Sequence, residues 1–201
     1  MVWVAVAMLA QKPIWSDFDR REEALRKKFH ATKHMSEADR KWLVGQVRHG
    51  TPPHRMVCQF VIVEAVGYGA FPRPLALRTL ERASIAAPPG ERGLPAQNYW
   101  ALAPGGLTRS FDAGWREYQG VFHGKHSASD IDSRERAFVD RNLGQGGQYA
   151  GSLLVSKSHL KPTARRWALK TVGEQVAKKP AKQRPFWEFV RRVVLARNPG
   201  K

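Results

Sequence analysis

The sequence predicts a mainly α-helical protein of about six short-to-medium helices, which are joined by long, irregular connections rich in proline and glycine. Several segments carry apolar residues at helical spacing, and residues typical of helix starts precede them. Hydrophobic residues make up 42% of the 201 residues, which is enough for one core. The 17 glycines and 13 prolines favour long connections.

Two helices are predicted in the first part of the chain, each after a serine. Ser16 and Asp19 fit a capping box, and the basic residues 26–28 fill the last turn of the first helix. Ser36 repeats the cap for the second helix, which Gly50 and the prolines after it should end. We expect these two helices to form an antiparallel hairpin.

Residues 56–71 form the most apolar stretch of the chain. The β-branched residues 61–63 favour a buried strand, whereas the length of the stretch favours a buried helix. We favour a core element over a membrane-embedded segment, because a membrane-spanning helix needs about 20 apolar residues. Glu64 interrupts the stretch, and we expect a salt bridge or solvent contact for its carboxylate.

Less regular elements follow in the middle of the chain. Pro74 fits the first turn of a helix that continues to Ile85. Residues 86–106 show almost no periodicity, which indicates a long loop that binds or clasps a partner. Two shorter helices are predicted, one near residues 110–118 and one over residues 133–143.

The charge divides the chain into two parts without separating two independent domains. We interpret residues 1–156 as a helical body with clasping loops, and residues 157–201 as a basic, amphipathic helical extension. This extension holds thirteen Lys or Arg residues and two glutamates, so most of the net charge of +17 lies there. An excess of this kind points to an anionic partner.

Two helices are predicted in the basic extension, one from Pro162 and one from about Phe186. The second gathers bulky apolar residues on one arc and cations on the other. The candidate residues for binding an anionic partner are Arg165, Arg166, Lys170, Lys178, Lys179, Lys182, Arg184, Arg191 and Arg192. The candidate apolar anchor consists of Phe186, Trp187, Phe189, Val190 and Val193.

Three interpretations of the last helix compete. It could dock on the core of its own chain and leave its charges solvated. It could lie at a membrane interface or against membrane subunits, for which aromatics flanked by cations are typical. It could also contact RNA, whose phosphates the cations would neutralise.

No motif in the sequence predicts catalysis, a cofactor or a metal site. His123, His126, Asp130 and Asp132 have a spacing that could hold zinc, but their small polar neighbours favour a solvated loop with an aspartate as helix cap. GQGGQ lacks the Lys-Ser/Thr of a P-loop, so a turn explains it. Cys58 lies in an apolar stretch, where a thiol is normally inert, and a single cysteine excludes a disulfide scaffold.

The sequence therefore predicts a non-catalytic structural or accessory subunit of a large multi-subunit assembly. We expect a mitochondrial inner-membrane respiratory complex or ATP synthase, with other subunits and acidic lipid on the matrix side as partners. The alternative is a ribosomal protein, organellar in type, that binds rRNA through residues 157–201. A secreted protein is not expected, because no positive region precedes the apolar residues before Lys12.

Overall fold

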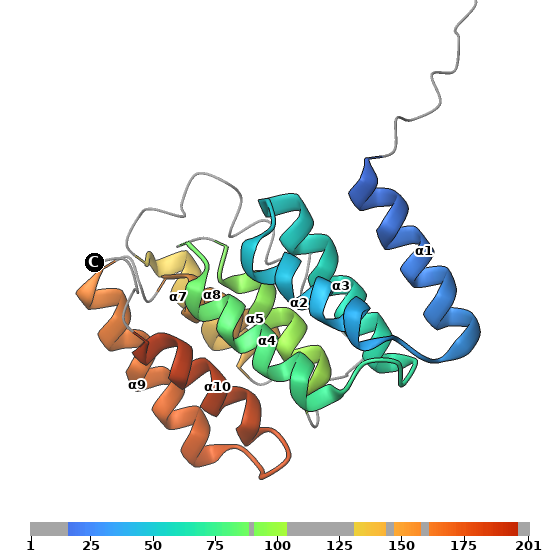
Figure 1. Ribbon diagram of the computed structural model, residues 1–201. Helices are drawn as coiled ribbons and strands as arrows, with labels where there is room; N and C mark the ends of the chain where they lie inside the picture. Colours follow the sequence, from blue (N-terminus) through green and yellow to red (C-terminus); the bar gives the residue numbers. More distant parts are fainter. Residues whose placement is uncertain (1–15, 89–90, 104–130, 144–146, 158–160, 197–201) are drawn as a thin grey trace, which may run out of the picture.

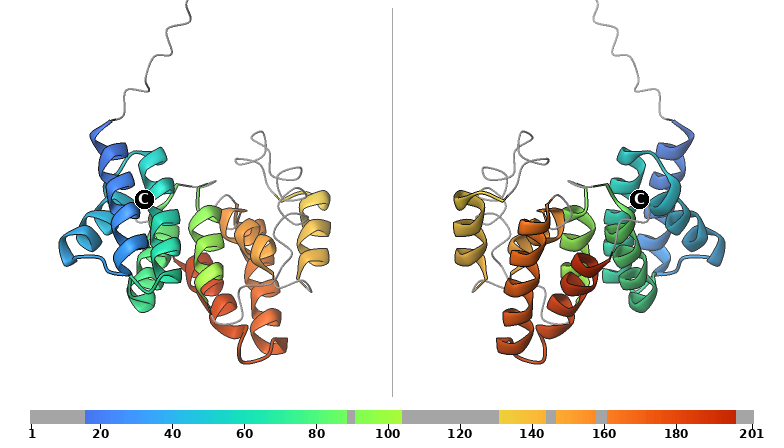
Figure 2. Two further views of the ribbon diagram at one scale, coloured as in Figure 1. Left: turned by 90° about the vertical axis from the view of Figure 1, so that its right-hand side faces the viewer. Right: turned by 90° about the vertical axis from the view of Figure 1, so that its left-hand side faces the viewer.

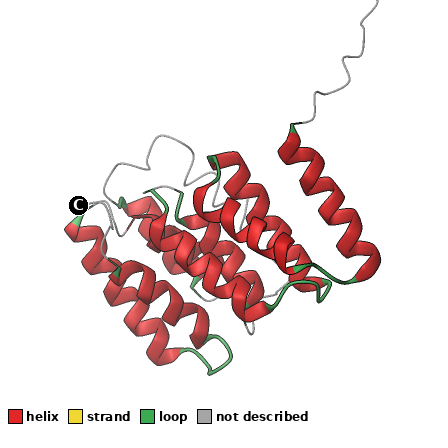
Figure 3. Ribbon diagram, in the orientation of Figure 1, coloured by secondary structure: helices red, strands yellow, loops and turns green. Residues whose placement is uncertain are grey.

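The computed structural model describes residues 16–88, 91–103, 131–143, 147–157 and 161–196, and this part of the chain is almost entirely helical (Figures 1 and 3). The prediction of a mainly α fold is confirmed. The described residues form nine helices, which is more than the predicted number of about six. They are α1 (Asp17–Thr32), α2 (Glu37–His49), α3 (Pro52–Gly67), α4 (Arg73–Ala86), α5 (Gly93–Leu102), α7 (Ser133–Asn142), α8 (Gln148–Lys157), α9 (Pro162–Lys178) and α10 (Arg184–Leu195).

The first two helices begin at the predicted serine caps. Ser16 and Asp19 form a reciprocal capping box at the start of α1, and Ser36 caps α2 through its side chain. Both helices pack against α3, and single side-chain contacts link them to each other. The Lys28 ammonium at the end of α1 lies 3.1 Å from a carboxylate oxygen of Asp39 at the start of α2.

The apolar stretch at 56–71 is helical up to Gly67, so the alternative of a buried strand is wrong. Two prolines occupy the first turn of α3, where their missing N–H groups cost nothing. The β-branched centre is accommodated because Val61 and Ile62 are fully buried, and burial overrides a modest helix propensity. Glu64 pairs with Arg26 and with His30 of α1, as expected for a salt-bridged carboxylate.

Two helices occupy segments in which no helix was predicted. α5 lies in the stretch predicted to be a loop, and α8 follows the glycine-rich turn. Every residue of α8 is buried, as are most residues of α5, so neither helix has the polar face that makes a helical pattern visible in a sequence. The helix predicted near residues 110–118 lies outside the described residues.

The core forms around α8, which contacts α5, α7, α9 and α10. Figure 2 shows α8 between α5 and α7. The last helix, α10, packs against α4, α5, α8 and α9. The described residues after position 157 therefore pack against the rest of the helical core, and the boundary between a body and an extension at this position stays a prediction. None of the described helices is both long and apolar enough to cross a membrane.

Candidate binding surfaces

The predicted apolar anchor on α10 is part of the protein's own core. Its five side chains are between 0 and 3% exposed, so they present no apolar face to a membrane or to another subunit; they are Phe186, Trp187, Phe189, Val190 and Val193. The ring of Phe189 stacks on Tyr99 of α5 with centroids 3.8 Å apart. The prediction of an external anchor is therefore wrong, because this face of α10 covers the other helices of the same chain.

Glycines on and before α8 allow α10 to approach this closely. A Cβ atom on Gly151 would lie 2.6 Å from the ring of Phe186, and one on Gly147 would lie 2.3 Å from the ring of Trp187. Gly147 also has a φ of +78°, in the left-handed region that favours glycine. Packing against α10 and the left-handed backbone therefore explain the glycine at position 147.

Arg192 is the one of the nine predicted cations that forms a bidentate ion pair with another described residue. Its guanidinium donates two hydrogen bonds to the Glu81 carboxylate of α4, at 2.6 and 3.0 Å. The hydrogen bond to Glu81 raises the pKa of Arg192 above its ordinary value. This bidentate pair joins the last helix to α4.

Three further cations of the predicted set bind backbone carbonyls near helix ends. Arg165 donates to the carbonyl of Leu195 at 2.8 Å, and Lys179 donates to the carbonyl of Leu143 at 2.6 Å. Arg184 donates to the carbonyl of Lys179 at 2.9 Å. Because the last carbonyls of a helix lack partners within the helix, these cations complete the helix ends.

The other five predicted cations are exposed and form no ion pair with a described residue; they are Arg166, Lys170, Lys178, Lys182 and Arg191. Three of them, Arg166, Lys170 and Lys178, follow one ridge of α9 at four-residue steps, with Glu174 at the remaining position. This cationic ridge covers about 18 Å of the helix. Long cationic side chains held on one rigid helix can contact an extended anion at several points.

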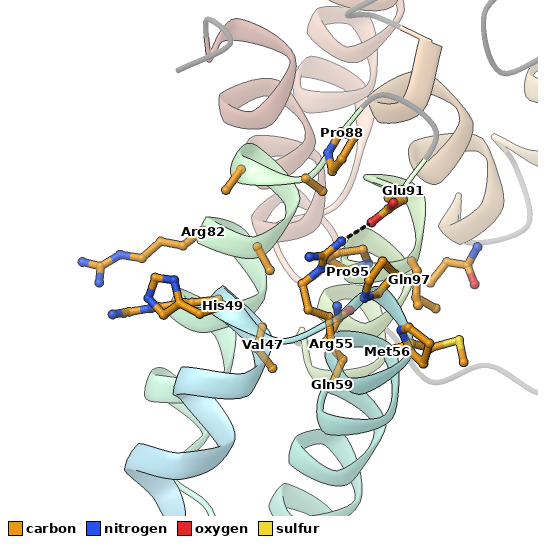
Figure 4. A pocket seen from close by; sticks show the side chains of 17 residues that line it. Val47, His49, Arg55, Met56, Gln59, Arg82, Pro88, Glu91, Pro95 and Gln97 are labelled. Carbon is orange, nitrogen blue, oxygen red and sulfur yellow. Dashed lines mark hydrogen bonds and ion pairs between the residues drawn. The ribbon is translucent and has the colours of Figure 1, made fainter. Parts of the chain in front are cut away.

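A pocket that the sequence did not predict opens between the ends of α2, α3, α4 and α5 (Figure 4). Its volume is about 970 Å³. The Arg55 guanidinium of α3 lies 2.8 Å from the Glu91 carboxylate within the lining. The alanines and prolines that end α4 are the only hint of it in the sequence, because small side chains leave room between helices.

Two of the residues considered for chemistry, Cys58 and Asp132, lie in structural positions. Burial raises the pKa of Cys58 to about 12, so its thiol is protonated at neutral pH. Asp132 caps α7 by accepting a hydrogen bond from the Glu135 N–H at 2.7 Å, as predicted for one of two aspartates. His123, His126 and Asp130 lie outside the described residues. Among the residues that are described, no group of histidine, cysteine and carboxylate side chains could hold a metal ion.

A buried ion pair joins α7 to α8. The Lys157 ammonium lies 2.8 Å from a Glu135 carboxylate oxygen, and the two side chains are 1 and 2% exposed. The other carboxylate oxygen of Glu135 accepts the N–H of Asp132 at 3.1 Å. Lys157 is fully engaged in the core and is not available to an anionic partner.

No protein-family model, no curated protein and no solved structure matches this chain.

Proposed function

We propose that the protein is a non-catalytic structural subunit of a large multi-subunit assembly, in which the cationic ridge of α9 binds an anionic partner. The observation that carries the proposal is the set of five exposed cations without an ion-pair partner among the described residues. The other four predicted cations stabilise the fold, so charge alone does not identify the binding residues. The rigid helix fixes the spacing of the cations on the ridge.

RNA is the partner that this surface supports best, in an assembly such as a ribosome. Exposed lysines and arginines neutralise phosphates without needing apolar contacts. Burial of the α10 aromatics removes the apolar half of the surface on which insertion at a membrane interface would depend.

A subunit on the matrix side of the mitochondrial inner membrane is the second candidate. The exposed cations support it, because a lysine or arginine near an anionic membrane surface contributes about 1 kcal/mol of attraction without any insertion. In this case the ridge would lie on acidic lipid headgroups of a respiratory complex or ATP synthase.

The test measures binding of the full chain to a fluorescent single-stranded RNA over a series of salt concentrations. We expect affinity to fall as salt rises, and we expect the triple variant Arg166→Gln, Lys170→Gln, Lys178→Gln to lower the slope of log K against log salt by about 2, since each phosphate contact contributes about 0.7. Binding of the same variants to vesicles that contain phosphatidylserine is measured in parallel over the same salt series.

The control is Lys27→Gln with Lys41→Gln, which removes two paired charges where the ridge variant removes three unpaired ones. These lysines are exposed cations of α1 and α2 that pair with Glu23 and Glu37. An unchanged salt slope in the ridge variant would overturn the proposed RNA contact. Ridge-dependent binding to vesicles, with no binding to RNA, would favour the second candidate.

A further inference from the structure

The walls of the pocket between α2, α3, α4 and α5 suit an apolar ligand. Val47 and Leu94 contribute branched side chains from α2 and α5. The apolar side chains at the end of α4 and at its C-cap are the methyl groups of Ala83, Ala86 and Ala87, and their small size leaves the space open. The volume of about 970 Å³ lies within the range of pockets that hold small molecules.

Two buried amides supply hydrogen-bonding groups to the lining. Gln59 and Gln97 are 4 and 8% exposed. The Gln59 side-chain oxygen accepts a hydrogen bond from the Asn98 amide at 3.3 Å. The Gln97 amide makes no hydrogen bond with another described residue, and its polar atoms are not among the fully buried ones that lack a partner, so they keep contact with the pocket or with solvent. Gln97 is therefore available to a polar group of a ligand.

The mouth of the pocket is cationic. Arg48, His49 and Arg82 line it, are exposed and form no ion pair with a described residue. The carboxylate among the lining residues, that of Glu91, is already paired with Arg55. Figure 4 shows Arg82 and His49 extending to one side of the pocket and Gln97 on the other. The cations on one side of the mouth can therefore bind an anionic group of a ligand.

We propose that this pocket binds a long-chain carboxylic acid with a hydrogen-bonding group at its far end. The carboxylate lies at Arg48 and Arg82, the apolar chain follows the alanines of α4, and the terminal polar group reaches the Gln97 amide. Charge complementarity selects an anionic head, and the apolar walls select the chain. This site uses none of the residues of the cationic ridge, so it goes beyond the proposed function.

The test titrates the full chain with dansylated undecanoic acid and displaces this probe with unlabelled ligands. We expect saturable binding of one probe per chain. We expect ω-hydroxypalmitic acid to displace the probe at about tenfold lower concentration than hexadecanol, because a charge-assisted hydrogen bond contributes more than a neutral one. Palmitic acid should fall between them.

Variants locate the binding site. Ala86→Trp fills the pocket from an exposed position and should abolish binding, whereas Ala177→Trp, exposed on α9, should leave it unchanged. Arg82→Gln should weaken the acid about tenfold and leave the alcohol unaffected. Thermal unfolding of each variant establishes that it is folded.

Several results would overturn the proposal. The full chain could fail to bind the probe saturably, or Ala86→Trp could bind it as well as the unchanged protein does. Displacement of the probe by acid and alcohol at equal concentrations would show that the cationic mouth does not bind the carboxylate. Loss of binding in Lys170→Gln would place the acid on the cationic ridge instead of in the pocket.

Discussion

Gly151 and Gly173 both lie inside helices, but their surroundings differ. A Cβ atom on Gly151 would meet the ring of Phe186 at 2.6 Å, whereas one on Gly173 would meet nothing within 4 Å. Replacing a helical glycine by alanine removes a conformational cost of roughly 0.5–1 kcal/mol when space permits. Alanine variants at the two positions therefore distinguish the conformational cost of a helical glycine from the stabilisation that close helix packing provides.

We predict opposite effects for the two alanine substitutions. Gly173→Ala should raise the free energy of unfolding by about 0.5–1 kcal/mol. Gly151→Ala should lower it by about 1–3 kcal/mol, because α10 or the Phe186 ring must move. Urea denaturation of both variants measures the difference. Equal stabilisation would show that α8 and α10 do not approach each other as described.

Asp39 gives a pH-dependent prediction at the start of α2. The Ser36 hydroxyl donates a hydrogen bond to the Asp39 carboxylate at 2.6 Å and lowers its pKa below the ordinary value, with a further contribution from Lys28. Because the folded pKa is lower than the unfolded one, the stabilisation is complete above the unfolded pKa. It is lost as the pH falls through the folded pKa.

Asp39→Asn should therefore lower the free energy of unfolding by about 0.3–1 kcal/mol at neutral pH, the typical contribution of a negative charge in the first turn of a helix. In strong acid the variant and the unchanged protein should converge. Urea denaturation across the acid range measures this, and Asp140→Asn, exposed on α7, is the control. A difference that persists in strong acid would contradict the role of the carboxylate charge.

At the scale of whole helices, sequence periodicity identified the elements that have one polar face. α1, α2, α4, α7, α9 and α10 begin close to their predicted starts, because a cap or a proline marks each start and a polar face marks each surface. α5 and α8 were missed because they are buried on nearly all sides. The ligand pocket was missed for a similar reason, since residues of four helices form it.

The ion pair between α7 and α8 allows a prediction at this scale. Lys157→Met leaves the Glu135 carboxylate buried without its cation and should cost about 3–5 kcal/mol of stability. The double variant Lys157→Met, Glu135→Gln should recover part of this loss, because a glutamine keeps the capping box of α7 without the charge. Urea denaturation of the single and double variants measures the interaction energy between Lys157 and Glu135. A double variant as unstable as the single one would show that the pair is not the cause.

At the scale of the whole molecule, the direction of an apolar face could not be predicted from the sequence. The arc of Phe186, Phe189 and Val193 is what either a membrane anchor or a core helix would carry. Only the fold shows that α4, α5, α8 and α9 occupy that side of α10. The role of each cation could not be predicted from the sequence either. Arg165 and Arg192 bind groups of the same chain, whereas Arg166 and Arg191 are exposed and form no ion pair with a described residue.

Glu174 gives a test of whether the exposed charge acts as a binding surface. It occupies the fourth position of the cationic ridge, between Lys170 and Lys178, and it is exposed. Glu174→Lys completes the ridge, so we expect tighter binding of single-stranded RNA and a salt slope steeper by about 0.7. Fluorescence anisotropy over a salt series measures both.

The control changes the net charge equally at a distant site. Glu37→Lys replaces an exposed carboxylate on α2, far from α9 in the fold (Figure 1). A long-range effect of net charge would strengthen binding in both variants, and it would do so mainly at low salt, where screening is weak. A contact at the ridge would strengthen binding in Glu174→Lys alone and would keep the steeper slope. Equal gains in the two variants would show that α9 attracts the polyanion without binding it.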